Sequence, residues 1–361
     1  MRAAVFRGGD IVVDTIPDPV PFEGQVLVKT LACGICGSDL HARRHAHRMV
    51  DASIRMTGKA RMDLARDVVF GHEFVCEVIE HGPGTTGKHR AGARVCSVPA
   101  LVIGGETKGL GYSNDFPGGY AERMVLSESL LLEIPNGLST DHAALTEPLA
   151  VGMHAVEKAQ LRGNDVPLVI GCGPVGLAVI ASLKLKGIGP IVAADYSPKR
   201  RELAAKMGAD VVVDPATTSP YATWQQHAAA PAQVDDGGPK LFGAAAARFR
   251  PALMFECVGV PGLLQKVFEG APRDARVVVV GVCMEPDRLE PLFGISKELN
   301  VQFVLGYTPE EFARALCVLA EGQVDAAPLI TGKVGVEGVR AAFEELANPE
   351  KHTKILVEPW R

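Results

Sequence analysis

The sequence predicts an α/β protein of two domains, a mostly β domain followed by a doubly wound domain built on a parallel sheet. The chain has 361 residues, more than the roughly 250–300 at which a single core stops growing. Up to about residue 150, short apolar runs are divided by Gly and Pro, which is typical of irregular β structure. From about Pro167 onward, apolar strands alternate with helix-like stretches, which indicates parallel strands with covered faces.

The second half predicts a regular order of elements. Strands and helices are expected to alternate over 168–171, 174–187, 191–195, 197–210 and 211–214. Further strands are expected at 253–259, 276–281 and 301–306, then helices at 309–322 and 341–348 and a last strand at 354–359. This last segment is expected to return to the first domain. Two stretches fit no element clearly. Residues 42–66 are basic and polar, and the Ala-, Pro- and Gly-rich stretch 216–250 is interpreted as a surface insertion with one helix.

Composition and charge exclude several classes of protein. Hydrophobic residues make up 47% and charged residues 22%, which is ordinary for a soluble globular chain. The formal net charge of -5 does not favour nucleic acid or an anionic membrane surface as a partner. The first residues lack the apolar core of a signal peptide, and no apolar run approaches the roughly 18 residues that span a bilayer. The 8 cysteines are scattered, so a disulfide framework is not expected and a cytoplasmic location is.

A dinucleotide-binding turn is predicted where the second domain begins. Gly171, Gly173 and Gly176 form a GxGxxG motif that follows an apolar strand and opens a helix. The three glycines allow a tight turn, room for a pyrophosphate and close packing of helix on strand, while backbone N–H groups face the phosphates. The residues of this turn predicted to bind the cofactor are Gly171, Gly173, Pro174, Val175 and Gly176. The alternative is a Gly-rich turn in an unrelated α/β fold.

Asp195 favours NAD over NADP. It ends the next strand, 19 residues after Gly176, where an acid binds the ribose hydroxyls and repels a 2′-phosphate. Lys199, Arg200 and Arg201 follow closely and oppose this preference. Two interpretations of these three residues stay open, a solvated helix face or an Arg200 side chain that lies over the adenine.

The first domain contains a group of residues suited to zinc. Cys36, His72 and Glu73 offer a thiolate, an imidazole and a carboxylate, the ligand types that zinc prefers at a site with one open position. Glu147 lies just before the dinucleotide domain, and a ligand there would put zinc in the cleft between the domains. Taken singly, each of these residues is more often a packing residue, and spacing alone does not join them.

Three neighbouring residues have plainer interpretations. Cys33 and Cys36 form a CxxC pair, which is compatible with half a structural zinc site or a redox pair. No second CxxC exists, so Cys33 is interpreted as structural. His45 and His47 lie in a basic run and are interpreted as part of a solvated loop rather than as metal ligands.

Taken together, these motifs resemble those of one enzyme superfamily. CGICGSDLH at 33–41, GHEF at 71–74, EPLAVG from Glu147, and GCGPVG with its later Asp are similar to the zinc-dependent medium-chain alcohol dehydrogenases, and closest to the sorbitol, butanediol and threonine dehydrogenase branch. GGYAER and the late PLITGKV extend the resemblance over nearly the whole chain. It implies a GroES-like catalytic domain over 1–152 and 303–361, with a Rossmann domain over 153–302.

The resemblance also implies ligands and a reaction. It makes Cys36 and His72 zinc ligands, and leaves open whether Glu73 or Glu147 is the direct acidic ligand. The zinc would act as a Lewis acid on the alcohol oxygen, and hydride would pass to the nicotinamide.

Two further residues carry the proton in this implied mechanism. Ser38 matches the hydroxyl beside the substrate oxygen, and His41 matches the histidine that ends a proton relay. The implied function is NAD-dependent oxidation of a secondary alcohol, diol or polyol.

One departure from the family pattern changes the expected metal content. Many relatives carry four closely spaced cysteines that bind a structural zinc, but the corresponding stretch here contains only Cys96. One catalytic zinc and no structural zinc are therefore expected. A homo-oligomer is also expected, and the choice between dimer and tetramer stays open. The unusual 42–66 segment is expected near the substrate entrance.

Two other functions compete with alcohol oxidation. A zinc-free quinone or enoyl reductase has the same fold but lacks the ligand set, so bound zinc discriminates between the two. A protein that binds a dinucleotide without turnover would not need Ser38 and His41, and an activity screen tests it.

Overall fold

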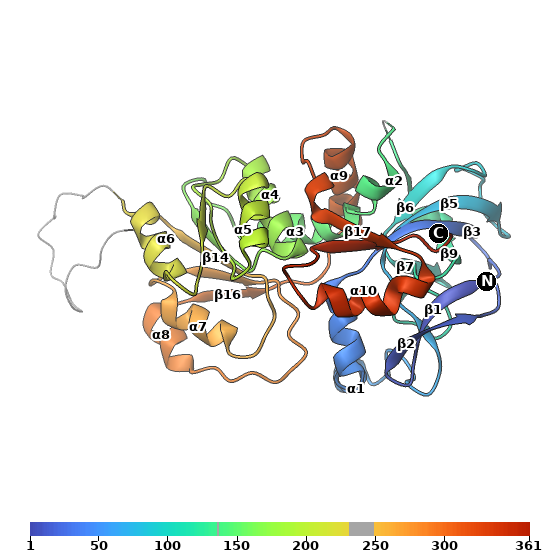
Figure 1. The fold of residues 1–361 in the computed structure, drawn as a ribbon, viewed down its shortest axis with the longest axis horizontal. Coiled ribbons are helices and arrows are strands. Elements are labelled where there is room, and N and C mark those ends of the chain that lie inside the picture. Colours follow the sequence, from blue (N-terminus) through green and yellow to red (C-terminus); the bar gives the residue numbers. More distant parts are fainter. Residues whose placement is uncertain (136, 231–248) are drawn as a thin grey trace, which may run out of the picture. The chain divides into compact units, whose positions relative to one another are not determined.

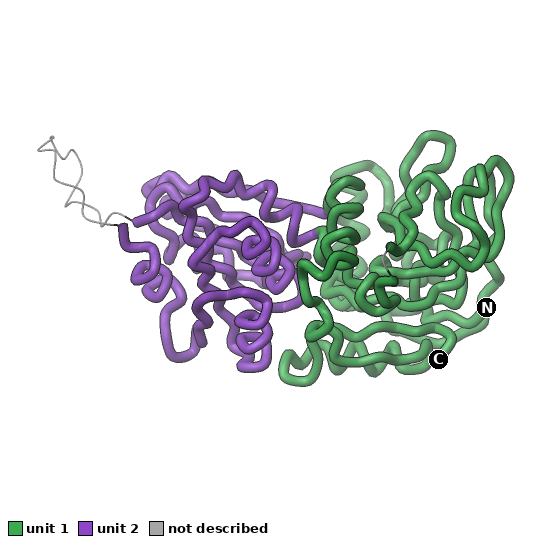
Figure 2. Tube along the Cα trace, turned by 90° about the horizontal axis from the view of Figure 1, so that it is seen from above, with its two compact units in different colours: residues 1–150, 307–361 green, residues 151–306 purple. Residues whose placement is uncertain are grey.

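The computed structural model describes residues 1–135, 137–230 and 249–361, which divide into two compact units (Figure 2). Unit 1 comprises residues 1–150 and 307–361, and unit 2 comprises residues 151–306. These bounds differ by two to four residues from the domain limits predicted above. None of the helices in the described ranges combines the length and apolar character that crossing a bilayer requires.

Unit 1 is built on a mostly antiparallel sheet, with β17 and β18 parallel, that brings distant parts of the chain together (Figure 1). Its strand order is β10-β6-β5-β3-β18-β17, and β9 also pairs with β3. The bounds are β3 Gln25–Gly34, β5 Glu73–His81, β6 Arg94–Ser97, β9 Arg123–Ser127, β10 Leu131–Glu133, β17 Ile330–Val334 and β18 Lys354–Val357. The late strand β18 lies between β3 and β17, so the C-terminal segment completes the first sheet.

Smaller elements complete unit 1. A second sheet has the order β2-β1-β4, and β7 pairs with β8 in a hairpin. The bounds are β1 Arg2–Arg7, β2 Asp10–Thr15, β4 Val68–Val69, β7 Ala100–Ile103 and β8 Glu106–Gly109. The helices that begin in this unit are α1 Gly37–Thr57, α2 Thr140–Ala143, α3 Thr146–Lys158, α9 Pro309–Ala320 and α10 Val339–Leu346. Side chains from β1, β3, β5 and α10 share one buried apolar core.

Unit 2 is a doubly wound domain with six parallel strands in the order β13-β12-β11-β14-β15-β16. Its strands are β11 Val166–Ile170, β12 Val192–Ala194, β13 Val211–Val213, β14 Ala252–Glu256, β15 Arg276–Val279 and β16 Asn300–Phe303. Its other helices are α4 Pro174–Leu185, α5 Pro198–Lys206, α6 Pro220–Ala228, α7 Leu263–Gly270 and α8 Pro291–Lys297. The strand order reverses between β11 and β14, and ligands of such sheets bind at this reversal. The predicted α/β class, with a mostly β part and a parallel-sheet part, is confirmed.

The two stretches that fitted no predicted element, 42–66 and 216–250, each contain helical residues. Residues 37–57 form the 21-residue helix α1, so the interpretation of His45 and His47 as part of a loop is wrong. Ala42, Ala46 and Ser53 recur at helical spacing and are buried, but the many basic residues between them concealed that pattern. The helix bends at His45, whose φ and ψ are -127° and 30°. In the 216–250 stretch, α6 forms, and residues 231–248 lie outside the described residues.

Candidate metal centre and dinucleotide site

The junction of β3 and α1 positions the first candidate ligand. β3 ends at Gly34, and Cys36 is the N-cap residue of α1. The backbone N–H of Cys36 donates to the carboxylate of Asp39, 3.2 Å away, which fixes the turn. The partial positive charge at the start of a helix is compatible with a thiolate ligand at this position.

His72 lies directly before β5 and faces this turn. Its Nδ1 is 3.4 Å from the Asp39 carboxylate, and its Nε2 is 3.4 Å from the Ser38 hydroxyl oxygen. Burial alone would lower the pKa of His72, but the negative charge of Asp39 outweighs it and holds that pKa well above its usual value. A metal-binding imidazole commonly turns its other nitrogen toward a carboxylate, so Nε2 is the atom suited to a metal.

Asp39 organises the centre, although sequence reasoning missed it. Its side chain is completely buried and accepts hydrogen bonds from the hydroxyls of Tyr112 and Tyr120, at 2.9 and 2.7 Å. Burial alone would raise the pKa of Asp39, but His72 and the two hydroxyls stabilise the carboxylate and lower that pKa. The available signal was its place inside the CGICGSDLH motif. An acid that becomes buried there would need partners, because Asp is seldom buried unpaired.

Glu73 is held by a buried lysine from the end of the sheet. Its two carboxylate oxygens lie 2.7 and 2.6 Å from Nζ of Lys354, which also donates to the backbone carbonyl of Ile35 at 3.1 Å. Burial would lower the pKa of Lys354, but Glu73 outweighs it and raises that pKa. Gly34 makes room for the Glu73 carboxylate, because a Cβ at Gly34 would lie 2.0 Å from a Glu73 oxygen. Lys354 is 281 residues away in sequence, so no local pattern predicted it.

Three of the four predicted ligands come together. Ligand atoms of Cys36, His72 and Glu73 all lie within 4.8 Å of one another. A thiolate, an imidazole and a carboxylate in one partly buried cluster fit the donor set of zinc. Glu147 is not in this group of three, but it interacts electrostatically with His72 and Glu73.

Glu147 has an unusual environment. Burial raises its pKa to about 7, and the neighbouring Glu73 carboxylate adds to the effect, while His72 and Lys354 oppose it. The buried hydroxyl of Tyr307 faces Glu147 without a well-formed hydrogen bond. A carboxyl group in this position can hold a proton, accept a hydrogen bond from Tyr307 or bind a cation.

Ser38 is oriented by Tyr112. The two hydroxyl oxygens are 3.0 Å apart. Because the Tyr112 hydroxyl donates its proton to Asp39, the Ser38 hydroxyl is left to donate to Tyr112. The Ser38 oxygen, 3.4 Å from Nε2 of His72, then remains able to accept a hydrogen bond. His41 lies one turn further along α1 and is partly exposed. Tyr112 was missed because no local motif marks it.

Cys33 lies outside the metal cluster. It is completely buried, and its sulfur packs where Gly119 leaves room, since a Cβ there would approach it to 2.5 Å. Burial raises the pKa of the Cys33 thiol well above its usual value. These properties match the structural interpretation given to Cys33.

The Gly-rich turn of unit 2 joins β11 to α4. The helix begins at Pro174, and Gly173 is its N-cap residue. A Cβ on Gly176 would lie 1.9 Å from the carbonyl oxygen of Gly171, so only glycine permits this close packing. The N–H groups at the start of α4 form the anion site expected of such a turn.

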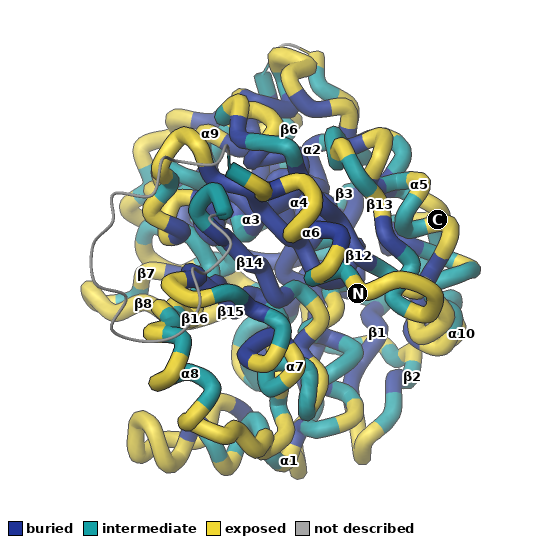
Figure 3. Tube along the Cα trace, turned by 90° about the vertical axis from the view of Figure 1, so that its left-hand side faces the viewer, coloured by how far each residue is buried: buried dark blue, intermediate teal, exposed yellow. Residues whose placement is uncertain are grey.

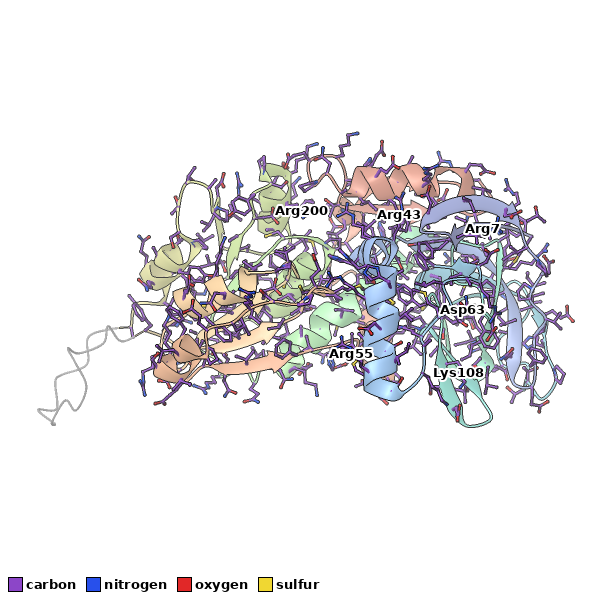
Figure 4. The ribbon with its side chains drawn as sticks, turned by 90° about the horizontal axis from the view of Figure 1, so that it is seen from below. Arg7, Arg43, Arg55, Asp63, Lys108 and Arg200 are labelled. Atoms are coloured by element: carbon purple, nitrogen blue, oxygen red, sulfur yellow. The ribbon has the colours of Figure 1, made fainter. Side chains whose placement is uncertain are left out.

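Asp195 and Arg200 flank this turn, in different ways. The Asp195 carboxylate accepts hydrogen bonds from the backbone N–H groups of Cys172 and Ser197, both at 2.8 Å. Nη1 of Arg200, a residue labelled in Figure 4, lies 3.9 Å from the place where a Cβ on Gly173 would be. Its Nε is buried and has no hydrogen-bond partner among the described residues. Arg201 instead binds backbone carbonyls at 195 and 196 and the carboxylate of Asp214. The three basic residues therefore do not form one uniform solvated face.

The chain matches two family descriptions over most of its length. Residues 22–136 match the alcohol dehydrogenase GroES-like domain, and residues 174–321 match the zinc-binding dehydrogenase domain. The (R,R)-butanediol dehydrogenase of Bacillus subtilis is 30% identical over 99% of this chain and 100% of its own length. The sorbitol dehydrogenase of the same organism is 26% identical over 100% of this chain and 98% of its own length.

A solved structure agrees with these relatives. The crystal structure of 2R,3R-butanediol dehydrogenase from Bacillus subtilis superposes with a TM-score of 0.79 at 28% identity, over 99% of each chain. Fold, donor cluster and Gly-rich turn define an oxidoreductase with a GroES-like domain and a Rossmann domain. The chain belongs to the zinc-binding alcohol dehydrogenase family, and the resemblance drawn from its motifs is confirmed.

Proposed function

We propose that this protein oxidises a secondary alcohol, diol or polyol with NAD, using one zinc ion held by Cys36, His72 and an acidic residue. The observation that carries the proposal is the cluster of three donor types within 4.8 Å. Glu73 stands inside this cluster but is engaged by Lys354, while Glu147 is outside it with a pKa near 7. Either acid supplies the third protein ligand.

The residues around the cluster have distinct roles in this proposal. When bound, zinc supplies a Lewis acid that makes a hydroxyl proton easier to remove. Ser38 accepts a hydrogen bond from that hydroxyl, because its own hydrogen is directed to Tyr112. As it takes up the proton it gives up its own hydrogen, so that Ser38 stays neutral and one proton leaves the site. Asp39 holds the imidazole of His72 in one orientation. His41 passes the proton to solvent, because an imidazole can take up and release a proton near neutral pH.

NAD is the proposed cofactor. Asp195 stands at the end of β12, where its carboxylate opposes a 2′-phosphate. Arg200 lies over Gly173, close to the turn that would hold the pyrophosphate. The residues proposed to contact NAD are Gly171, Gly173, Pro174, Val175, Gly176, Asp195 and Arg200.

We also propose a homo-oligomer, formed through the edge of the unit 2 sheet. β16 is the last strand of that sheet, and its Phe303 is 64% exposed. Nearby, Leu305 is 87% exposed, and Leu292 and Ile295 of α8 are each 72% exposed. Figure 3 shows the predominantly exposed α8, which buries none of its residues. An open strand edge with apolar neighbours is suited to pairing with a second copy.

A cytoplasmic location is proposed because all 8 cysteines are free.

One experiment separates the proposed function from its alternatives. The purified chain is loaded with zinc, analysed for metal, and screened against 2,3-butanediol, sorbitol, threonine and simple secondary alcohols while NADH absorbance is followed. One zinc per chain and turnover of at least one alcohol are expected. A zinc-free preparation that reduces quinones or enoyl substrates would support the reductase, and NAD binding without turnover of any compound would support a binding protein. Two zinc ions per chain would contradict the single-site proposal.

A further inference from the structure

An exposed arginine lies against the ring that orients Ser38. The guanidinium carbon of Arg61 is 4.9 Å from the ring centroid of Tyr112. Arg61 follows the end of α1, and its backbone N–H donates to the Ser53 hydroxyl at 2.9 Å, which anchors the segment to the helix. Arg61 is thus separated from the hydroxyl of Ser38 by one aromatic side chain.

The Tyr112 ring is held in place, so the position of Arg61 is defined. Phe70 contacts the ring edge-on at 5.4 Å, and the His72 ring lies 5.6 Å away. The hydroxyl of Tyr112 is fixed by Asp39 and Ser38. A cation stacked on such a ring gains from the quadrupole of the ring while its N–H groups at the edge stay available.

The carboxylates near Arg61 in sequence and space have other partners. Within the described ranges, no carboxylate forms an ion pair with Arg61. Asp63 directs its carboxylate to the backbone N–H of Ala65, at 2.9 Å. A Cβ on Gly109 of β8 would lie 4.0 Å from Nη2 of Arg61. The carboxylate of that strand, Glu106, pairs with Lys108 at 2.7 Å and also interacts with the charge of Lys59. Figure 4 labels Asp63 and Lys108, which lie on this side of unit 1.

We propose that Arg61 binds an anionic group, a carboxylate or a phosphate, carried by the alcohol substrate. The protein would then act on a hydroxy acid or a polyol phosphate in preference to an uncharged diol or polyol. A guanidinium presents a planar fork of N–H donors that matches both oxyanions. This inference rests on the proposed dehydrogenase function, because it places the reacting hydroxyl at Ser38 and the anion beyond Tyr112.

Paired substrates test the proposal. The kcat/KM of wild type is measured for sorbitol 6-phosphate against sorbitol, and for 2,3-dihydroxybutanoate against 2,3-butanediol. At least one charged member should exceed its neutral partner, and whichever pair responds identifies phosphate or carboxylate as the anion. Arg61→Gln should lower the charged-to-neutral ratio about 10- to 100-fold, as the loss of a charge-assisted hydrogen bond implies. Arg61→Lys should lower the ratio less, and the effect should appear mainly in KM.

The control variant is Arg55→Gln. Arg55 is equally cationic and exposed, and it pairs with Asp51 on α1 rather than facing Tyr112. It should keep the charged-to-neutral ratio of wild type. Thermal unfolding of each variant shows whether the fold is retained. A wild-type ratio near one for both pairs, or equal ratios in wild type and Arg61→Gln, would overturn the proposal.

A binding measurement distinguishes failure of this inference from failure of the proposed function. Calorimetric titration with sorbitol 6-phosphate and with 2,3-dihydroxybutanoate does not require turnover. If no alcohol is oxidised, the dehydrogenase proposal fails, yet binding of one anion by wild type that weakens about tenfold or more in Arg61→Gln would still support an anion site. Absence of binding by wild type, or equal affinity in the variant, would reject the site even if sorbitol or 2,3-butanediol is oxidised.

Discussion

At the scale of single residues, the metal centre depends on a few buried charges that satisfy one another. Asp39 holds His72 from one side, and Lys354 holds Glu73 from the other. The grouping of Cys36, His72 and Glu73 was predictable because zinc selects their types and they stand in recognisable motifs, whereas Glu147 lies outside this group. Tyr112 and Lys354 were not predictable, because their roles come from contacts between segments that are far apart in sequence. Asp39 stands in a recognisable motif, but its partners His72 and Tyr112 lie in other segments.

Replacing Cys36 should separate metal binding from cofactor binding. Cys36→Ser removes the proposed thiolate, so zinc content should fall and alcohol oxidation should drop at least about 100-fold, as expected when several kcal/mol of Lewis-acid stabilisation are lost. NAD affinity should stay within about twofold, because the Gly-rich turn belongs to unit 2. Metal analysis and fluorescence titration with NADH measure the two effects. The exposed Cys317→Ser is the control, and full zinc content in Cys36→Ser would reject Cys36 as a ligand.

Replacing Lys354 should destabilise the protein through an unpaired charge. Lys354 and Glu73 are 1% and 0% exposed, so Lys354→Met leaves a buried carboxylate without its partner. The free energy of unfolding should fall by about 3–5 kcal/mol. Urea unfolding in the presence of a chelator measures the loss without a contribution from metal. The double variant Glu73→Gln with Lys354→Met should recover part of it, whereas an additive, larger loss would contradict the pairing.

Replacing Asp195 should weaken the proposed preference for NAD. Asp195→Ala removes the carboxylate that opposes a 2′-phosphate, so the ratio of kcat/KM for NAD to that for NADP should fall by about tenfold or more. The N–H groups of Cys172 and Ser197 donate to different oxygens of Asp195, so Asp195→Asn keeps one of these two acceptors while it removes the charge. A ratio that falls only in the alanine variant would attribute the effect to loop geometry rather than to charge.

At the scale of elements, the regular alternation of unit 2 was easier to predict than α1. Each strand of the parallel sheet is a short apolar run, and each following helix begins with a recognisable turn. The helix α1 has the right buried spacing, but its surface is crowded with Arg and His, and its bend at His45 interrupts the pattern. The polar surface therefore obscured an element that carries Ser38 and His41.

A carboxylate at the short helix η1 (Glu128–Leu130) should make stability depend on pH. Glu128 is 8% exposed and accepts backbone N–H groups of Thr86 and Lys88 at 2.6 and 3.1 Å. Burial would raise the pKa of Glu128, but these hydrogen bonds outweigh it and lower that pKa. A lowered folded-state pKa contributes stability above the unfolded value of about 4.3, and this is lost as the pH falls through the folded value.

Thermal unfolding of Glu128→Gln measures this contribution. The variant should melt several degrees below wild type at pH 7, and the difference should shrink steadily as the pH falls below about 4.3. Glu202→Gln changes an exposed carboxylate that pairs only along its helix, so it is the control. A melting difference for Glu128→Gln that stays constant from pH 7 to pH 3 would assign the loss to packing.

At the scale of the whole molecule, the edge of the unit 2 sheet exposes large apolar side chains that a single chain leaves uncovered. Phe303→Lys places a charge on β16, which should weaken pairing between copies and shift the protein to a smaller species. Sedimentation velocity at several concentrations measures the shift. Phe22→Lys, at a residue that is 63% exposed in unit 1, is the matched control. If wild type is already monomeric, or if both variants change equally, β16 is not the interface.

The late position of β18 has a consequence for synthesis. Lys354 reaches Glu73 across 281 residues, and β18 occupies a place between β3 and β17 that no earlier strand fills. During translation, the segments that carry Cys36, His72 and Glu73 therefore emerge long before the strand that completes the sheet of β3 and β5. The 156 consecutive residues of unit 2 emerge between them and contain every strand of the parallel sheet. Domains generally fold as units while the chain is made, so we expect the dinucleotide domain to form first and the metal to be bound in the last stage of maturation.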